Sequence, residues 1–136
     1  MNLPYLACML ATAQFYQLPP RVLPSIQAVE GGFAGAIHPN KDGSDDLGVM
    51  QVNTVWVQPI ARHAHMSAED VQTRLVADDC FNIAAAGLIL RTYMNETRGD
   101  LMAAIGDYHS HTPALNRAYQ AKVWASAAAL FGGDPR

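Results

Sequence analysis

The stretch VLPSIQAVEGG, residues 22–32, carries the strongest indication of the fold and ends on a lone acid, Glu30. Its apolar residues predict a helix, and the glycine pair predicts where that helix ends. A carboxyl group set against Ile26, Ala28 and Val29 loses water when it ionises, so we expect its pKa to be raised. Such a group can donate a proton near neutral pH and take one back, although a helix-terminal glutamate before glycine is also a common structural ending.

The rest of the chain predicts a mostly α fold, forming a single domain over residues 1–136 with one irregular flap or short hairpin at residues 33–46. Apolar spacing, N-cap residues and terminal glycines mark the expected helices. They are residues 3–17, 20–30 and 47–53, one that Ser67 caps, a central Ala/Gly-rich one through 83–90, one from Asp100 to about 108, and one from Thr112-Pro113 to 132.

Composition excludes several classes of function. The 136 residues are 50% hydrophobic and only 15% charged, which is typical of a compact globular chain. The net charge is −3 and the nine basic residues are scattered, so the chain has no electrostatic footprint of a nucleic-acid binder. No uninterrupted apolar stretch is long enough to span a membrane.

The N-terminal segment has some features of a secretion signal. Residues 1–20 carry no charged side chain, and Ala11-Thr12-Ala13 has the small-x-small pattern of a cleavage site. The missing basic region, Pro4 and the short apolar core favour a first helix instead. An exported protein of this sequence would have a signal that is absent here, or leave by another route.

Two cysteines, Cys8 and Cys80, cannot form a four-thiolate metal site and are too far apart for a CxxC redox motif. Spacing alone leaves two buried free thiols or one long-range disulfide. A disulfide would stabilise the fold by roughly 4 kcal/mol and imply an oxidising compartment.

Four motifs in order resemble the family 1 lytic transglycosylases, which have the lysozyme-like fold and cleave peptidoglycan. They are Glu30 with its two glycines, the segment GVMQVN at 48–53, Asn82 opening a small-residue helix, and AIGDYHS at 104–110. The resemblance runs from Cys8 to about Val123.

Within that family the chain is most similar to the small specialised enzymes that accompany type IV and type III secretion, conjugation and pilus systems. The segment DGSDDL at 42–47 and the positions of Cys8 and Cys80 carry this finer resemblance. It implies a disulfide between these cysteines, a periplasmic location, a monomer that acts on peptidoglycan strands, and partners in such a machine.

The resemblance implies that Glu30 is the single catalytic acid. It would protonate the oxygen between N-acetylmuramic acid and N-acetylglucosamine, then deprotonate the muramic C6 hydroxyl, giving a 1,6-anhydro product with no cofactor. The substrate's N-acetyl group would stabilise the positive charge, so no second carboxylate is required. Tyr108 would hold the acid in place.

The resemblance also implies a sugar groove. Gly48 would let the backbone approach the glycan, Met50 would pack against the sugar, and Gln51 would hydrogen-bond it. Asn82 is interpreted as a structural cap that ties down the central helix.

Two departures from the family pattern affect this groove. Gly31 follows the acid where relatives have serine, so the missing hydroxyl is absent or replaced by Ser44 or water. Relatives have Asn-Ala-Gly after the tyrosine, where this chain has His109-Ser110-His111. We expect His109 to contact glycan.

Other chemistries are less well supported by spacing. The pairs His63/His65 and His109/His111 have no third ligand and no HExxH, so no metal site is predicted. Ser110 has no GxSxG context, and the glycines at 31, 32 and 35 follow a helix where a nucleotide loop would follow a strand.

Two alternatives stay open beside the transglycosylase. One is a hydrolytic lysozyme that pairs Glu30 with Asp45 or Asp46, and the other is a non-catalytic module that binds glycan or a secretion component. Trp56 and Trp124 could stack on sugars, but we expect both to be core residues.

Overall fold

The computed structural model describes residues 3–136, so the first two residues of the predicted 1–136 domain lie outside it. It is mostly helical with a small antiparallel sheet, which confirms the predicted fold class. The elements are α1 (Leu3–Tyr16), α2 (Val22–Glu30), β1 (Ile37–Pro39), β2 (Asp45–Leu47), β3 (Val52–Asn53), η1 (Thr54–Trp56), α3 (Val57–Ala64), α4 (Ala68–Ala77), α5 (Asp79–Glu96), α6 (Leu101–His109) and α7 (Pro113–Phe131).

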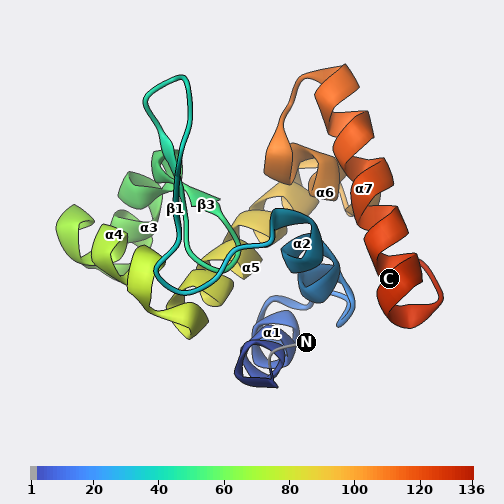
Figure 1. Cartoon of the computed structure of the whole chain (residues 1–136), viewed down its shortest axis with the longest axis horizontal. Coiled ribbons are helices and arrows are strands. Elements are labelled where there is room, and N and C mark those ends of the chain that lie inside the picture. Colours follow the sequence, from blue (N-terminus) through green and yellow to red (C-terminus); the bar gives the residue numbers. More distant parts are fainter. Residues whose placement is uncertain (1–2) are drawn as a thin grey trace.

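Helix α5 is the centre of the fold, as its small residues predicted. It packs against α1, α4 and α6, while α7 packs against α2 and α6 (Figure 1). Gly87 allows the close approach of α1, because a Cβ there would collide with the Thr12 side chain and lie 3.0 Å from the Tyr16 ring. The result is two raised parts, the hairpin on one side and α6–α7 on the other, joined by α5 (Figure 1).

The predicted flap is a hairpin of β1 and β2, with Ile37 paired to Leu47, and β3 continues the sheet beside β2. The short helix expected at residues 47–53 is wrong. Leu47 ends a strand, residues 48–51 form a turn, and Val52 begins β3. Gly48 (φ 68°) and Gln51 (φ 53°) adopt left-handed backbone, which breaks a right-handed helix.

Helix starts follow the predicted capping chemistry in two cases. The Ser67 side chain accepts a hydrogen bond from the Asp70 N–H, and the Asp100 side chain accepts one from the Ala103 N–H. Thr112 precedes α7 but makes no such side-chain bond.

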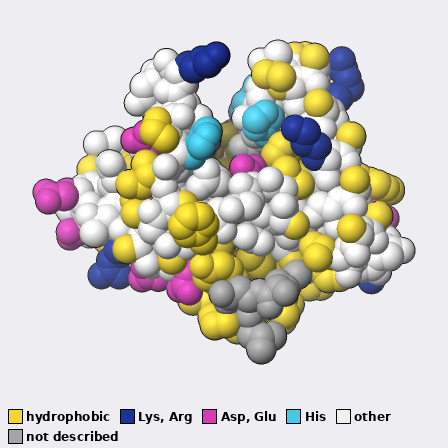
Figure 2. Space-filling model, viewed as in Figure 1, with side chains coloured by type: hydrophobic (Ala, Val, Ile, Leu, Met, Phe, Trp, Pro, Cys, Tyr) yellow, Lys and Arg dark blue, Asp and Glu magenta, His cyan; other side chains and the backbone are white. Residues whose placement is uncertain are grey.

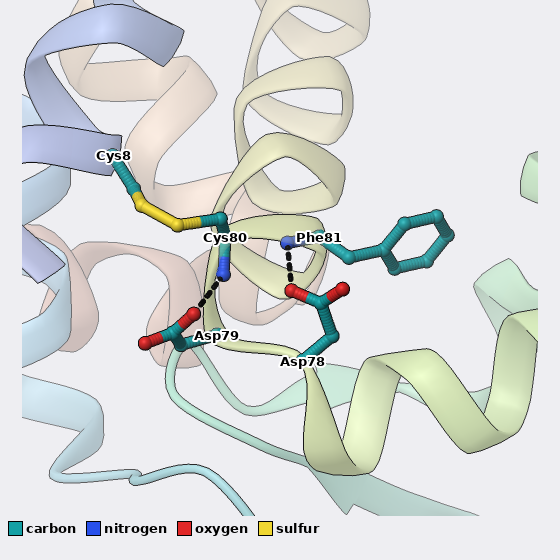
Figure 3. Close-up of a disulfide and its surroundings, with 5 residues drawn as sticks. All are labelled: Cys8, Asp78, Asp79, Cys80 and Phe81. Carbon is teal, nitrogen blue, oxygen red and sulfur yellow. Dashed lines mark hydrogen bonds between the residues drawn. A yellow bond between two sulfur atoms is a disulfide. The ribbon is translucent and has the colours of Figure 1, made fainter. Parts of the chain in front are cut away.

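Cys8 and Cys80 are disulfide-bonded, which settles the choice that spacing left open. The bond links α1 to the first turn of α5, with the Cα atoms 5.4 Å apart and the two cysteines 72 positions apart in sequence (Figure 3). Beside it, the Asp79 carboxylate accepts from the Cys80 N–H and the Asp78 carboxylate from the Phe81 N–H (Figure 3). The start of the central helix is thus held both covalently and by its cap.

Trp124 is not a core residue, contrary to the sequence prediction. It is 45% exposed on α7, with the Arg136 guanidinium 6.0 Å from its ring centroid. Only Tyr119, Val123 and Ala127 of α7 are buried, a stripe at four-residue spacing that leaves Trp124 on the outer side. Within residues 3–136, no helix is both long and apolar enough to cross a bilayer.

Candidate active site

A groove of about 640 Å³ lies between the hairpin and the α6–α7 corner. Figure 2 shows this hollow with histidine side chains on both sides and an acidic side chain at its base. Its lining includes Glu30 from the end of α2, Asp46 from β2 and Tyr108 from α6. Residues far apart in sequence therefore meet in one open cleft, the usual form of a ligand site.

The backbone at the end of α2 places Glu30 against this groove. Gly31 ends the helix in the left-handed conformation (φ 66°), and its N–H donates to the Gln27 carbonyl. Gly32 then packs so tightly on the turn that a Cβ there would collide with the carbonyl oxygens of Gly48 and Val49. This close approach joins the two motifs that the sequence separates by a loop.

The pKa of Glu30 is raised above its ordinary value, as expected from its apolar surroundings. Burial is the largest cause, because it penalises the charged form, and the negative charge of Asp46 adds to it. A hydrogen bond from Tyr119 and the positive charge of Lys122 act in the opposite direction. The net effect is that Glu30 keeps its proton to a higher pH than an ordinary glutamate does, which suits a proton donor.

Tyr119 makes the hydrogen bond that the sequence analysis assigned to Tyr108. Its hydroxyl donates to the Glu30 Oε2 at 2.5 Å across 89 residues of sequence, while the Tyr108 hydroxyl donates to the Met50 carbonyl at 2.8 Å. Tyr119 lies on the buried stripe of α7, and the sequence analysis did not single it out. The available signal was its hydroxyl, because a buried tyrosine needs a polar partner.

Met50 and Gly48 do not line the groove, contrary to the sequence prediction. The Met50 side chain is fully buried in the core, and its N–H donates to the Asn82 side-chain oxygen at 2.8 Å. The backbone of Gly48 lies close to other parts of the protein and not to the groove, since a Cβ there would collide with the Leu75 carbonyl and the Asn82 amide. Both residues build the turn that supports the groove.

Asn82 is the structural anchor that the sequence predicted. It is fully buried, and its amide nitrogen donates at 2.8 Å to the carbonyl oxygens of both Leu47 and Leu75. With the bond from the Met50 N–H, one side chain joins the end of β2, the turn at 48–51 and the end of α4 to α5.

Gln51 and Ser44 do line the groove. The Gln51 amide nitrogen donates to the Gly48 carbonyl at 3.0 Å, which fixes the side chain and leaves its oxygen for a ligand. The Ser44 hydroxyl donates to Asp42 and accepts from the amides of Asn40 and Asn53. Because its hydrogen is already donated, Ser44 holds the hairpin loop together and is poorly placed to replace the missing family serine.

Two histidines line the wall opposite the hairpin. The His109 ring stacks on Tyr119, with centroids 4.8 Å apart and planes 12° from parallel. His111 Nε2 lies 3.9 Å from the Asp107 carboxylate. Within residues 3–136, the one acid–cysteine cluster with metal-like spacing is Cys8, Asp79 and Cys80, whose sulfurs are bonded to each other.

The two candidate second acids differ in position. Asp46 lines the groove and receives a hydrogen bond from the Asn53 amide at 3.0 Å, whereas its strand neighbour Asp45 is not among the lining residues. Successive residues of a strand point to opposite faces, which accounts for the difference. Trp56 was expected to be a core residue. It packs against the core but is only partly buried, and it also lines the groove.

Comparison with known proteins shows the family of the chain. Residues 7–131 match the family described as Transglycosylase SLT domain. Invasion protein IagB of Salmonella typhimurium (strain SL1344) is 27% identical over 137 residues, covering 97% of this chain and 82% of that protein. Invasion protein IagB of Salmonella typhi is 27% identical over 129 residues, covering 91% and 77%.

Proposed function

Because the chain belongs to the Transglycosylase SLT domain family, whose activity is directed at peptidoglycan, we propose that Glu30 is its catalytic acid and base. The observation that supports this most is a desolvated carboxyl group, hydrogen-bonded by Tyr119, on the wall of an open groove of about 640 Å³.

In the proposed first step, protonated Glu30 donates its proton to the oxygen that links N-acetylmuramic acid to N-acetylglucosamine. The bond between that oxygen and C1 breaks, and the N-acetyl carbonyl oxygen of the muramic residue bonds to C1. The raised pKa supports this role, because it keeps the proton on the acid nearer to neutral pH.

In the second step, the Glu30 carboxylate removes the proton from the muramic C6 hydroxyl. The O6 atom bonds to C1 and the N-acetyl oxygen leaves, so the product is 1,6-anhydro-N-acetylmuramic acid and no water is consumed. The Tyr119 hydrogen bond stabilises the carboxylate formed between the two steps. One acid thus serves both steps, in line with substrate-assisted exceptions to two-carboxylate hydrolysis.

Asp46 supports a second candidate, a hydrolase. Its carboxylate faces the same groove and lies close enough to Glu30 to raise the pKa of that acid. It could activate a water molecule, which would produce a reducing end.

Mass spectrometry of muropeptides released from purified sacculi distinguishes the two. The transglycosylase predicts anhydro ends for the wild type and none for Glu30→Gln, while Asp46→Asn keeps releasing anhydro ends. Reducing ends that disappear in both variants would establish the hydrolase instead. Release of nothing by the folded wild-type protein would identify a binding module.

We further infer a role in opening the wall locally for an envelope-spanning apparatus, in an extracytoplasmic and oxidising compartment. The Cys8–Cys80 disulfide and the family's substrate support the compartment, and the two relatives named invasion proteins support the role. Fractionation of cells followed by a free-thiol count on the unreduced protein tests the compartment. A cytoplasmic, fully reduced protein would contradict it.

A further inference from the structure

We propose that Trp56, Tyr93 and His111 form a glycan-binding subsite beside Glu30, which takes a neutral N-acetylhexosamine ring of the strand. This inference rests on the proposed function, since it assigns a binding role to another part of the same groove. None of these three residues is required by the chemistry at Glu30.

The three rings form a continuous aromatic cluster. The Trp56 and Tyr93 centroids are 5.8 Å apart with planes at 81°, and the Tyr93 and His111 centroids are 5.3 Å apart with planes at 71°. They come from three separate elements: η1, the C-terminal part of α5 and the loop before α7. All three line the groove, so the cluster is part of its surface.

The cluster is rigid at one end and accessible at the other. Trp56 and Tyr93 pack against the hydrophobic core, which fixes their rings, whereas the His111 side chain is 65% exposed. Rings held in place with polar atoms at their tips suit a sugar, which presents an apolar face and a rim of hydroxyl groups. Burial raises the pKa of Tyr93, and the negative charges of Glu96 and Asp107 raise it further. The Tyr93 hydroxyl therefore stays a hydrogen-bond donor.

The charges around the cluster indicate a neutral ligand. The Asp107 carboxylate lies 3.9 Å from His111 and accepts a hydrogen bond from the Asn116 amide. Lys41, in the hairpin loop, is the one lysine or arginine among the described residues that line the groove. A peptide carboxylate would therefore meet a negative charge at this end, while sugar hydroxyl and amide groups could donate to it.

Tyr108 lines the groove together with the acid and the cluster. Burial is the main reason that the pKa of Tyr108 is raised, and interactions with Glu30, Asp46 and Tyr93 add to the shift. The Tyr108 hydroxyl donates a hydrogen bond to the Met50 carbonyl, which fixes the position of its ring. A strand cleaved at Glu30 can extend along the groove onto the aromatic rings.

The test uses the two tryptophans of the chain, of which only Trp56 lines the groove. In the double variant Glu30→Gln/Trp124→Phe, catalysis is removed and Trp56 is the sole tryptophan. Titration with β-1,4-linked N-acetylglucosamine oligomers of three to six units should give a saturable change in Trp56 emission. Adding His111→Ala or Tyr93→Ala should weaken binding at least tenfold.

The matched control is the same titration of Glu30→Gln/Trp56→Phe, in which Trp124 alone reports and its emission should stay constant. Because His111 is exposed, His111→Ala should keep the parent melting temperature, so its effect on binding is not a folding defect. The proposal is overturned if Trp56 emission stays constant at oligomer concentrations that saturate binding by calorimetry, or if calorimetry detects no binding.

A kinetic readout separates this proposal from the assignment of the reaction. In the wild-type background, His111→Ala should raise KM for glycan strands at least fivefold and change kcat less than twofold. A fall in kcat at constant KM would contradict a binding role. Reducing ends in the muropeptide analysis would refute the transglycosylase and leave the titration result standing.

Discussion

Replacing Glu30 by glutamine should stabilise the protein at neutral pH and leave its stability unchanged in acid. Burial raises the pKa of Glu30 above its ordinary value of 4.5. Below that value the carboxyl group is protonated in both the folded and the unfolded chain, so it contributes no difference. As pH rises, the unfolded chain releases the proton first, and wild-type stability falls until the folded protein is ionised as well.

The size of this effect follows from linkage. Each unit by which the folded pKa exceeds the unfolded one lowers wild-type stability by about 1.4 kcal/mol above the folded pKa. For a domain of this size that corresponds to roughly 4 °C in Tm. Glutamine keeps the shape and can still accept the Tyr119 hydrogen bond, so the substitution mainly removes the ionisation.

Thermal or urea denaturation of both proteins between pH 4 and pH 8.5 measures the difference directly. We expect the two curves to coincide near pH 4 and to separate as pH rises, with Glu30→Gln the more stable. Glu69→Gln is the control, because Glu69 is exposed in the first turn of α4, where the helix dipole favours its charge. That variant should be neutral or less stable. Parallel curves for wild type and Glu30→Gln at every pH would refute a desolvated acid.

Three further substitutions probe the groove and its support. Tyr119→Phe removes the hydrogen bond that lowers the pKa of Glu30. A bond to a charged group contributes about 1.5–3 kcal/mol, so kcat should fall about tenfold, and the alkaline limb of the pH–rate profile should move to higher pH. An unchanged profile would count against this bond. Asn82→Ala leaves three buried backbone groups without their partner. The free energy of unfolding, measured by urea denaturation, should fall by about 3 kcal/mol or more. A loss below about 1 kcal/mol would show that water replaces the amide. The double change Cys8→Ser/Cys80→Ser opens a loop spanning 72 residues and should cost about 4 kcal/mol by the same measurement, and a Tm equal to that of wild type would argue against it.

Local signals predicted most of the helical framework. Ser67 and Asp100 start helices as their capping chemistry indicated, and the resemblance drawn from four motifs is confirmed by the family match over residues 7–131. The turn at 48–51 was mistaken for a helix because its residues are ordinary helix formers apart from the glycine. Its conformation is set by Asn82, which lies 32 residues from Met50 in sequence, and single-sequence patterns do not reveal such a contact.

The site was predictable only where chemistry and local environment coincide. Glu30 stands out because an acid follows an apolar helical stretch. Tyr119 does not, because it occupies the same buried stripe as Val123 and its hydroxyl reaches Glu30 only after α7 packs on α2. Met50 was misplaced for the converse reason, since its motif suggested ligand contact and the structure buries its side chain in the core.

The groove depends on support that lies behind it. Gln51 faces the groove with left-handed backbone, a conformation that is unfavourable for a residue with a side chain. The turn keeps it because Asn82 holds the Met50 N–H on one side and Tyr108 holds the Met50 carbonyl on the other. We therefore expect Met50 to influence the proposed reaction without touching the glycan, since it links the buried anchor of α5 to Tyr108, which lines the groove. A substitution at Met50 would thus alter the groove through the positions of Gln51 and Tyr108.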